Sequence, residues 1–330
     1  MKFLIAGAGA IGGYIGAKLA RAGEDVTLFA RGPHLKAMQD KGVCVIAAEG
    51  SEETAFYAYP KLTGDLSTAT GMDVILLGVK AHGLTGLAPQ IAPLIGPNTT
   101  VLSTQNGIPW WYFQNDAGEF AGLHLESVDP GSVIADAIPK QAVVGSLVYF
   151  ATDLAEPGVI RHIEGNRISL GEPDGSRSDR IKGIADALIK AGLRAPVTTR
   201  LRSEMFVKLL GNAAFNPISA LTRATLVKMA QDPGARALVA EIMTEVAAVA
   251  ARLGITLPVS IEQRIAGAEA VGEHKTSMLQ DLELGRPMEI DGMFDAPLAL
   301  ARLAQVETPT LDLLVALCKV RARSAELYGA

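Results

Sequence analysis

The chain has 330 residues, of which 49% are hydrophobic and 20% are charged, and its formal net charge is −5. This length allows a sizeable core and exceeds what one core usually needs, so we expect two domains. The slightly acidic balance gives no electrostatic reason to expect a nucleic acid or an anionic membrane as partner. The two cysteines, Cys44 and Cys318, form neither a disulfide framework nor a metal-binding spacing, and we expect reduced thiols.

The first 30 residues combine a short apolar strand with a glycine-rich turn. Residues 2–6 read as a buried strand, GAGAIG follows at 7–12, residues 11–22 have helical character, and 26–30 read as the next strand. In this β-α-β frame the first glycine allows the tight turn, the second lets the backbone approach a pyrophosphate, and the third lets helix and strand pack closely. The helix N-terminus then favours the phosphates. We therefore expect a dinucleotide to be bound by Gly7, Ala8, Gly9, Ala10, Ile11 and Gly12.

The same N-terminus could be mistaken for a secretory signal, because Lys2 precedes an apolar run. The glycines within the run, and the polar turn that feeds into another apolar strand, fit folded structure better. No other stretch reaches the roughly 18 uninterrupted apolar residues of a membrane span. We expect a cytoplasmic protein.

Arg31 stands at the end of the second predicted strand, where NAD enzymes usually present a carboxylate to the ribose hydroxyls. A guanidinium suits a 2′-phosphate by its charge and its planar set of donors, so the sequence favours NADP over NAD. The alternative is a surface arginine in a turn.

Two further strands are predicted to end in polar residues. Residues 72–82 form a third buried strand that ends near Lys80, and residues 100–103 lead into Asn106 and Gly107. Ligands collect at the carboxyl ends of strands in open α/β sheets, so Lys80 and Asn106 are candidates for the same rim. An Asn-Gly pair also commonly just makes a turn. The five histidines show no metal-binding spacing, and we expect no metal.

The character of the chain changes near Thr199. Residues 142–171 look β-rich around a turn signal at Gly165 and Asn166, residues 178–191 read as a helix, and 193–197 as a last short strand. Alanine- and leucine-rich helical periods then fill most of the chain. We expect an α/β protein, with an NADP-binding Rossmann-type domain at 1–198 and an all-α substrate and catalytic domain at 199–330.

Within the helical half, Lys208, Asn212 and Asn216 stand four residues apart in MFVKLLGNAAFNPI. Each step of four drifts only about 40° around a helix, so the three polar groups share one face. The flanking residues are nearly all apolar, which argues against a solvated surface, and buried polar groups need partners. Burial would also lower the pKa of the ammonium and make it a better proton donor. Pro217 is expected to kink or end the helix at Asn216.

A second polar cluster, SMLQDLELGRPMEID, occupies residues 277–291. Its first part reads as an amphipathic helix with solvated charges, and Gly285 and Pro287 then break the helix and leave Glu289 in or beside a turn. A carboxylate at Glu289 could hold and orient the Lys208 ammonium, as a general acid requires.

From residue 2 to about residue 326 the sequence resembles the 2-dehydropantoate 2-reductase (ketopantoate reductase) family. Four motifs carry the resemblance: the GAGAIG turn with Arg31, the Gln-Asn-Gly turn, K-x-x-x-N-x-x-x-N, and S-M-x-Q-D…G-R…E-I-D. The resemblance implies a Rossmann domain followed by a helical domain, and NADPH-dependent reduction of a 2-oxo acid, most simply 2-dehydropantoate to pantoate in pantothenate biosynthesis. It implies a small-molecule substrate, and a homodimer stays an open alternative.

Position by position, the resemblance assigns a role to each motif residue. The catalytic lysine falls on Lys208 and its supporting carboxylate on Glu289. The other matches are Asn106, Asn212, Asn216 and Ser277 for the substrate, and the glycine turn, Arg31, Lys80 and Asn106 for NADPH. In this reading Lys208 stabilises the charge that grows on the carbonyl oxygen and donates the proton.

One segment departs from the family pattern. Residues 108–138 are longer and more aromatic than the usual connection, and Trp110 and Trp111 adjoin Asn106. They could reshape the pocket for another 2-oxo acid, or pack an extra surface loop. Two rival functions are another β-hydroxyacid dehydrogenase, which would not be expected to show the 277–291 cluster, and an NADP-binding sensor without turnover. A short-chain dehydrogenase motif at Tyr57 and Lys61 is excluded because Pro60 lies inside it.

Overall fold

The computed structural model describes residues 1–47, 55–114 and 118–329. By their internal contacts these residues form two compact units. The first contains residues 1–105 and 110–201, and the second contains residues 106–109 and 202–330.

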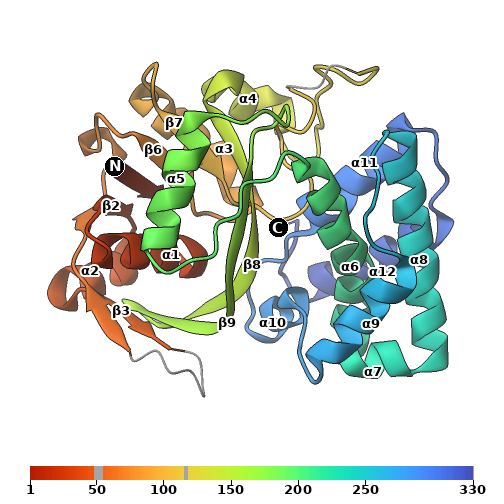
Figure 1. Cartoon of the computed structure of the whole chain (residues 1–330). Coiled ribbons are helices and arrows are strands. Elements are labelled where there is room, and N and C mark those ends of the chain that lie inside the picture. Colours follow the sequence, from red (N-terminus) through yellow and green to blue (C-terminus); the bar gives the residue numbers. More distant parts are fainter. Residues whose placement is uncertain (48–54, 115–117, 330) are drawn as a thin grey trace. The chain divides into compact units, whose positions relative to one another are not determined.

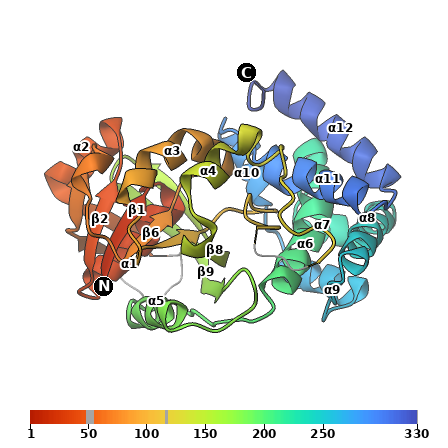
Figure 2. The same cartoon turned by 90° about the horizontal axis from the view of Figure 1, so that it is seen from above.

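The first unit is built on a mixed sheet with helices on its faces. Over the described residues its strands are β1 (Lys2–Ala6), β2 (Asp25–Phe29), β3 (Val43–Ile46), β4 (Phe56–Ala58), β5 (Lys61–Thr63), β6 (Val74–Leu77), β7 (Thr100–Ser103), β8 (Val143–Glu156) and β9 (Val159–Gly171), in the spatial order β4-β3-β9-β8-β7-β6-β1-β2-β5. Its α-helices are α1 (Ala10–Arg21), α2 (Gly32–Lys41), α3 (Leu84–Ile91), α4 (Val133–Ala137) and α5 (Asp179–Lys190). Figure 2 shows α3 and α4 on one face of the sheet and α5 on the other.

The central part of this sheet is parallel because helices connect its strands. β1 pairs in parallel with β2 and β6, and β6 with β7. Residues 3–6 and 74–77 are all buried, as expected for strands covered on both faces. β8 and β9 then form a long antiparallel hairpin, visible as the green arrows in Figure 1.

The second unit is helical over its described residues. It comprises α6 (Leu201–Thr222), α7 (Leu226–Gln231), α8 (Pro233–Arg252), α9 (Ile261–Val271), α10 (Ser277–Glu283), a π-helical turn η6 (Asp291–Asp295), α11 (Ala296–Leu303) and α12 (Pro309–Ser324). α8 packs against α7, α9, α11 and α12, as can be followed in Figure 1. A Rossmann-type domain followed by an all-α domain is thus confirmed.

Three local predictions were wrong. The turn between β8 and β9 lies at residues 157–158, and Gly165 is inside β9, where its φ of +72° accompanies a register shift against β8. A bulge and a turn both select glycine at positive φ, so the sequence signal was ambiguous. Residues 193–197 form only two isolated bridges, at Arg194 and Val197. α6 continues through Pro217, because buried neighbours such as Phe215 and Ile218 hold the helix in place.

The segment at 72–82 also needs correction, because it is not the third strand of the sheet. Three short strands, β3, β4 and β5, precede it along the chain, and the strand itself spans only Val74–Leu77.

Candidate active site

The glycine turn between β1 and α1 is shaped by close backbone contacts. Gly7 has a φ of +112°, which favours glycine. A Cβ on Gly12 would lie 2.2 Å from the carbonyl oxygen of Gly7, so only glycine allows this approach of helix to turn. A Cβ on Gly9 would lie no closer than 3.9 Å to a described atom, the carbonyl oxygen of Gly78. The turn is therefore tight behind Gly7 and Gly12 and open at Gly9, which fits the close approach of a pyrophosphate.

The N-terminus of α1 supports the same interpretation. Gly9 is its N-cap residue and makes no side-chain capping hydrogen bond. The first turn of the helix contains no acidic residue. Backbone N–H groups and the helix dipole then favour an anion at this position.

His34 on α2 fixes the glycine turn from the side. The amide of Gly158 donates to its Nδ1 (2.9 Å), so the neutral ring carries its proton on Nε2 and donates it to the carbonyl oxygen of Ala8 (2.8 Å). The amide of Ala8 in turn donates to the carbonyl oxygen of Phe29 (2.8 Å). This contact could not be predicted from the sequence, because both partners of His34 are backbone atoms.

Arg31 and Lys80 follow the ends of β2 and β6, the two strands that flank β1. In a parallel arrangement both positions lie at the same sheet edge as the glycine turn. The Arg31 side chain is exposed. Its guanidinium donates to the neutral Oε1 of Gln90 at 3.2 Å and lies over the Phe29 ring. Lys80 is half-buried. A cation at each position suits the phosphates of NADPH.

In the helical unit, Lys208, Asn106 and Glu289 come together. Nζ of Lys208 donates to Oδ1 of Asn106 at 2.7 Å, and Nδ2 of Asn106 faces Oε2 of Glu289 at 3.4 Å. This is the orientation of the amide in which its oxygen meets the cation and its nitrogen meets the carboxylate. Asn106 therefore forms an amide bridge between the lysine and the glutamate, which sequence reasoning could only pair directly.

Asn106 is held in the helical unit by its neighbours. The amide of Ile108 donates to the carbonyl oxygen of Gly292 at 2.9 Å. Gly107 has a φ of +79°, and a Cβ there would lie 2.0 Å from the same carbonyl oxygen. The Asn-Gly pair thus makes a turn and also delivers a functional amide, so the two alternatives were not exclusive.

The environment of Lys208 changes its acidity. Burial of the ammonium lowers its pKa to about 8, and the negative charge of Glu289 opposes this shift. At neutral pH the group remains mostly protonated, yet it gives up its proton more readily than an exposed lysine. A proton donor with these properties can serve a carbonyl reduction.

Asn212 and Asn216 lie on the same helix and share one contact. Their Nδ2 atoms lie 3.5 Å and 3.9 Å from Sδ of Met293, on the π-helical turn η6. A thioether is a weak acceptor, so these amides can exchange it for a better one. Met293 was missed in the sequence, because nothing about a methionine between Gly292 and Phe294 indicates such a contact.

Ser277 is the first residue of α10, and its side chain is exposed, whereas the preceding Thr276 is buried and caps the helix. Ser277 takes part in none of the contacts above. Trp110 and Trp111 are buried in the first unit, at 4% and 1% exposure, and the Trp111 ring packs against Gly145. Residues 115–117 of the aromatic segment lie outside the described residues.

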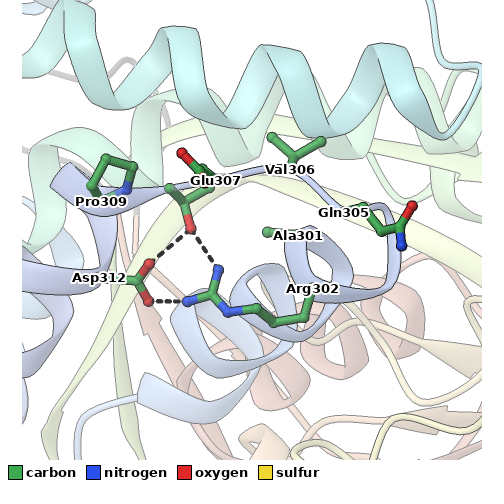
Figure 3. Close-up of a pocket in the computed structure, with 8 residues that line it drawn as sticks. Ala301, Arg302, Gln305, Val306, Glu307, Pro309 and Asp312 are labelled. Carbon is green, nitrogen blue, oxygen red and sulfur yellow. Dashed lines mark hydrogen bonds and ion pairs between the residues drawn. The ribbon is translucent and has the colours of Figure 1, made fainter.

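A separate cavity of about 450 Å³ lies between the end of α11 and the start of α12 (Figure 3). Its guanidinium, Arg302, is bound to Asp312 and to Oγ1 of Thr308 (3.1 Å). The charge of Arg302 is thus already neutralised, which makes the cavity a poor site for a carboxylate substrate.

In the described part of the chain, no cluster of three or more His, Cys, Asp or Glu side chains is arranged to hold a metal ion. Among the same residues, no helix is long and apolar enough to cross a membrane.

A Rossmann-type unit with an open glycine turn, followed by a helical unit with a half-buried lysine of lowered pKa, defines a nicotinamide-dinucleotide-dependent oxidoreductase. Two family models cover most of the chain: "Ketopantoate reductase PanE/ApbA" matches residues 3–175, and "Ketopantoate reductase PanE/ApbA C terminal" matches residues 200–322. The chain belongs to the ketopantoate reductase family.

Individual relatives agree with this assignment. A 2-dehydropantoate 2-reductase of Mesorhizobium japonicum is 49% identical over the whole of both chains, and one of Pyrococcus horikoshii is 30% identical over 97% of both. The solved structure of a candidate ketopantoate reductase from Ralstonia solanacearum MolK2 superposes with a TM-score of 0.93 at 38% identity and 99% coverage of both chains. A D-mandelate dehydrogenase with NADH and anilino(oxo)acetate shares the fold, with a TM-score of 0.83 at 24% identity, over 99% of this chain and 100% of that one.

Proposed function

We propose that the chain reduces 2-dehydropantoate to pantoate with NADPH, in pantothenate biosynthesis. The observation that carries this proposal is the contact of Lys208 with Asn106 and, through it, with Glu289. Membership of the ketopantoate reductase family and the 49% identical 2-dehydropantoate 2-reductase support the substrate.

The residues of the first unit would hold the cofactor. The open side of Gly9 and the N-terminus of α1 would take the pyrophosphate, and Arg31 the 2′-phosphate. Lys80 would add positive charge at the same sheet edge. When bound, NADPH supplies the hydride that the keto carbon accepts.

Lys208 would supply the other half of the reduction. Its ammonium stabilises the negative charge that grows on the carbonyl oxygen and transfers one proton to that oxygen, which gives the 2-hydroxy acid. Asn106 keeps the ammonium in place, and Glu289 keeps enough negative charge nearby for the lysine to regain a proton from solvent. Overall, one hydride and one proton are consumed for each substrate.

Asn212, Asn216 and Ser277 would bind the substrate. The two amides can exchange Met293 Sδ for the hydroxyl or carboxylate oxygens of a 2-oxo acid. Exposed Ser277 has its hydroxyl available for the same purpose.

The experiment is NADPH oxidation by the purified chain against a panel of 2-oxo acids that includes 2-dehydropantoate, with NADH in parallel. We expect 2-dehydropantoate with NADPH to give the highest kcat/KM. A higher value for another 2-oxo acid would assign a different substrate within the family. Turnover of none of them, with NADPH still bound, would favour a sensor over an enzyme.

We also propose that the enzyme acts in the cytoplasm. Both cysteines are buried free thiols, which fits a reducing compartment. Cell fractionation would test the location. Light scattering after gel filtration would show whether a homodimer forms.

A further inference from the structure

Tyr328, which follows α12, binds two carboxylates of the π-helical turn η6. Its hydroxyl lies 2.8 Å from Oδ1 of Asp291 and 3.1 Å from Oδ2 of Asp295. These are the first and last residues of η6, so one side chain spans the whole turn. π-Helical turns are rare, and they occur frequently at functional sites.

The chemistry of this contact favours a stable clamp. Burial and the two carboxylates raise the pKa of the Tyr328 hydroxyl, so it remains a protonated donor. Two neighbouring carboxylates would repel each other, but Nζ of Lys319 lies 2.5 Å from Oδ1 of Asp295 and offsets part of the charge. A phenol, an ammonium and two carboxylates therefore form one connected group around η6.

The same chain segment carries the groups around the proton donor. Glu289 lies two residues before η6, and Gly292 within η6 accepts the hydrogen bond from Ile108 that holds the Asn106 loop. The amide of Met288 also donates to the carbonyl oxygen of Leu327 at 3.0 Å. The segment 288–292 is thus attached to residues 327–328 on one side and to residues 106–108 on the other.

We propose that Tyr328 is a positioning residue for the reduction, because it fixes the turn that places Glu289 and Asn106 around Lys208. The inference rests on the proposed role of Lys208 and adds a residue that no motif of the chain contains. It also gives a role to Asp291, the last residue of the E-I-D motif, as the acceptor of the clamp.

The test uses Tyr328→Phe, which removes only the hydroxyl, with Tyr59→Phe as the matched control because Tyr59 is exposed. We expect kcat to fall about 10-fold in Tyr328→Phe, since hydrogen bonds to charged groups are the stronger ones. The Kd for NADPH, measured by fluorescence, should remain unchanged, because the proposed phosphate contacts lie in the other unit. Asp291→Asn is the second variant and should lower kcat in the same direction.

A second readout does not depend on turnover. The pKa of Lys208 can be followed by ¹³C NMR of its Cε, assigned with Lys208→Arg. If the clamp holds Glu289 near the ammonium, the Lys208 pKa in Tyr328→Phe falls below the wild-type value, whereas a merely structural role would lower the Tm and leave this pKa in place.

The outcomes separate the two proposals. If the wild type shows no turnover, but the Lys208 pKa is lower in Tyr328→Phe than in the wild type, the proposed function is overturned and the clamp is retained. If the wild type turns over, and both variants keep the wild-type kcat and the wild-type Lys208 pKa, the clamp is overturned and the proposed function is retained.

Discussion

The candidate sites of the two units are built from different groups of the chain, backbone in the first unit and side chains in the second. The glycine turn of the first unit offers backbone groups, and its shape depends on side chains that are missing at Gly7, Gly9 and Gly12. The site in the helical unit depends on side chains that are present, half-buried and paired, above all Lys208 and Asn106. A cofactor recognised by its phosphates can be held by local backbone geometry, whereas a proton donor needs a tuned environment that distant segments must supply.

The largest effect is expected at Lys208, the proposed proton donor. Lys208→Ala should lower kcat by roughly 10²- to 10⁴-fold, the usual contribution of a general acid. The Kd for NADPH should stay within a factor of two or so of the wild-type value, since the phosphates are assigned to the other unit. Exposed Lys36, changed to Ala, is the control. A nearly normal kcat in Lys208→Ala would remove this residue from the mechanism.

The next effect is expected at the glycine turn. Gly12→Ala places a Cβ 2.2 Å from the Gly7 carbonyl oxygen, so the turn has to open. Overpacking of this kind typically costs about 1–3 kcal/mol of stability, and we expect weaker NADPH binding by calorimetry as well. Gly86→Ala is the control, because a Cβ there meets nothing within 4 Å. Equal NADPH affinity in the two variants would contradict the proposed binding of the pyrophosphate at the glycine turn.

A smaller and more selective effect is expected from Arg31→Ala. Loss of a charge-assisted contact to the 2′-phosphate is worth about 1.5–3 kcal/mol, which corresponds to roughly a 10- to 150-fold loss of NADPH affinity. Binding of NADH, which lacks this phosphate, should hardly change. Calorimetry with both cofactors measures the ratio, and a wild-type preference for NADH would exclude this role for Arg31.

The mildest test changes only the pH. If Lys208 donates the proton, as proposed, the rate of reduction should be constant below its pKa of about 8 and fall as the pH rises through that value. Glu289 raises this pKa, so Glu289→Gln should move the decline to lower pH. kcat measured across the alkaline range would show both effects. A decline that does not move in Glu289→Gln would separate the carboxylate from the lysine.

The sequence predicted those parts of the site that depend on local geometry. The G-x-G-x-x-G turn follows from the conformations that only glycine adopts, and the shared face of Lys208 and Asn212 follows from the helical period. The amide bridge could not be predicted from the sequence, since residues 106, 208 and 289 come into contact only after the chain has folded. The contact of His34 with Ala8 was equally hidden, because it involves backbone atoms at 8 and 158.

The fold was predicted by the same kind of reasoning. Buried strands are short continuous apolar runs and amphipathic helices have a clear period, so the Rossmann-type and helical parts could be recognised. Pro217 failed as a helix stop because tertiary packing outweighed local propensity. Gly165 failed as a turn because the sequence does not distinguish a turn from a bulge.

Residues 106–109 belong by their contacts to the helical unit, although they lie in sequence between two stretches of the first. The group formed by Lys208, Asn106 and Glu289 is therefore not encoded by one contiguous stretch of the gene. A fragment that begins at residue 202 would carry Lys208 and Glu289 but lack Asn106. Exchanging helical halves between relatives would consequently separate Lys208 from its own Asn106, unless residues 106–109 are transferred as well.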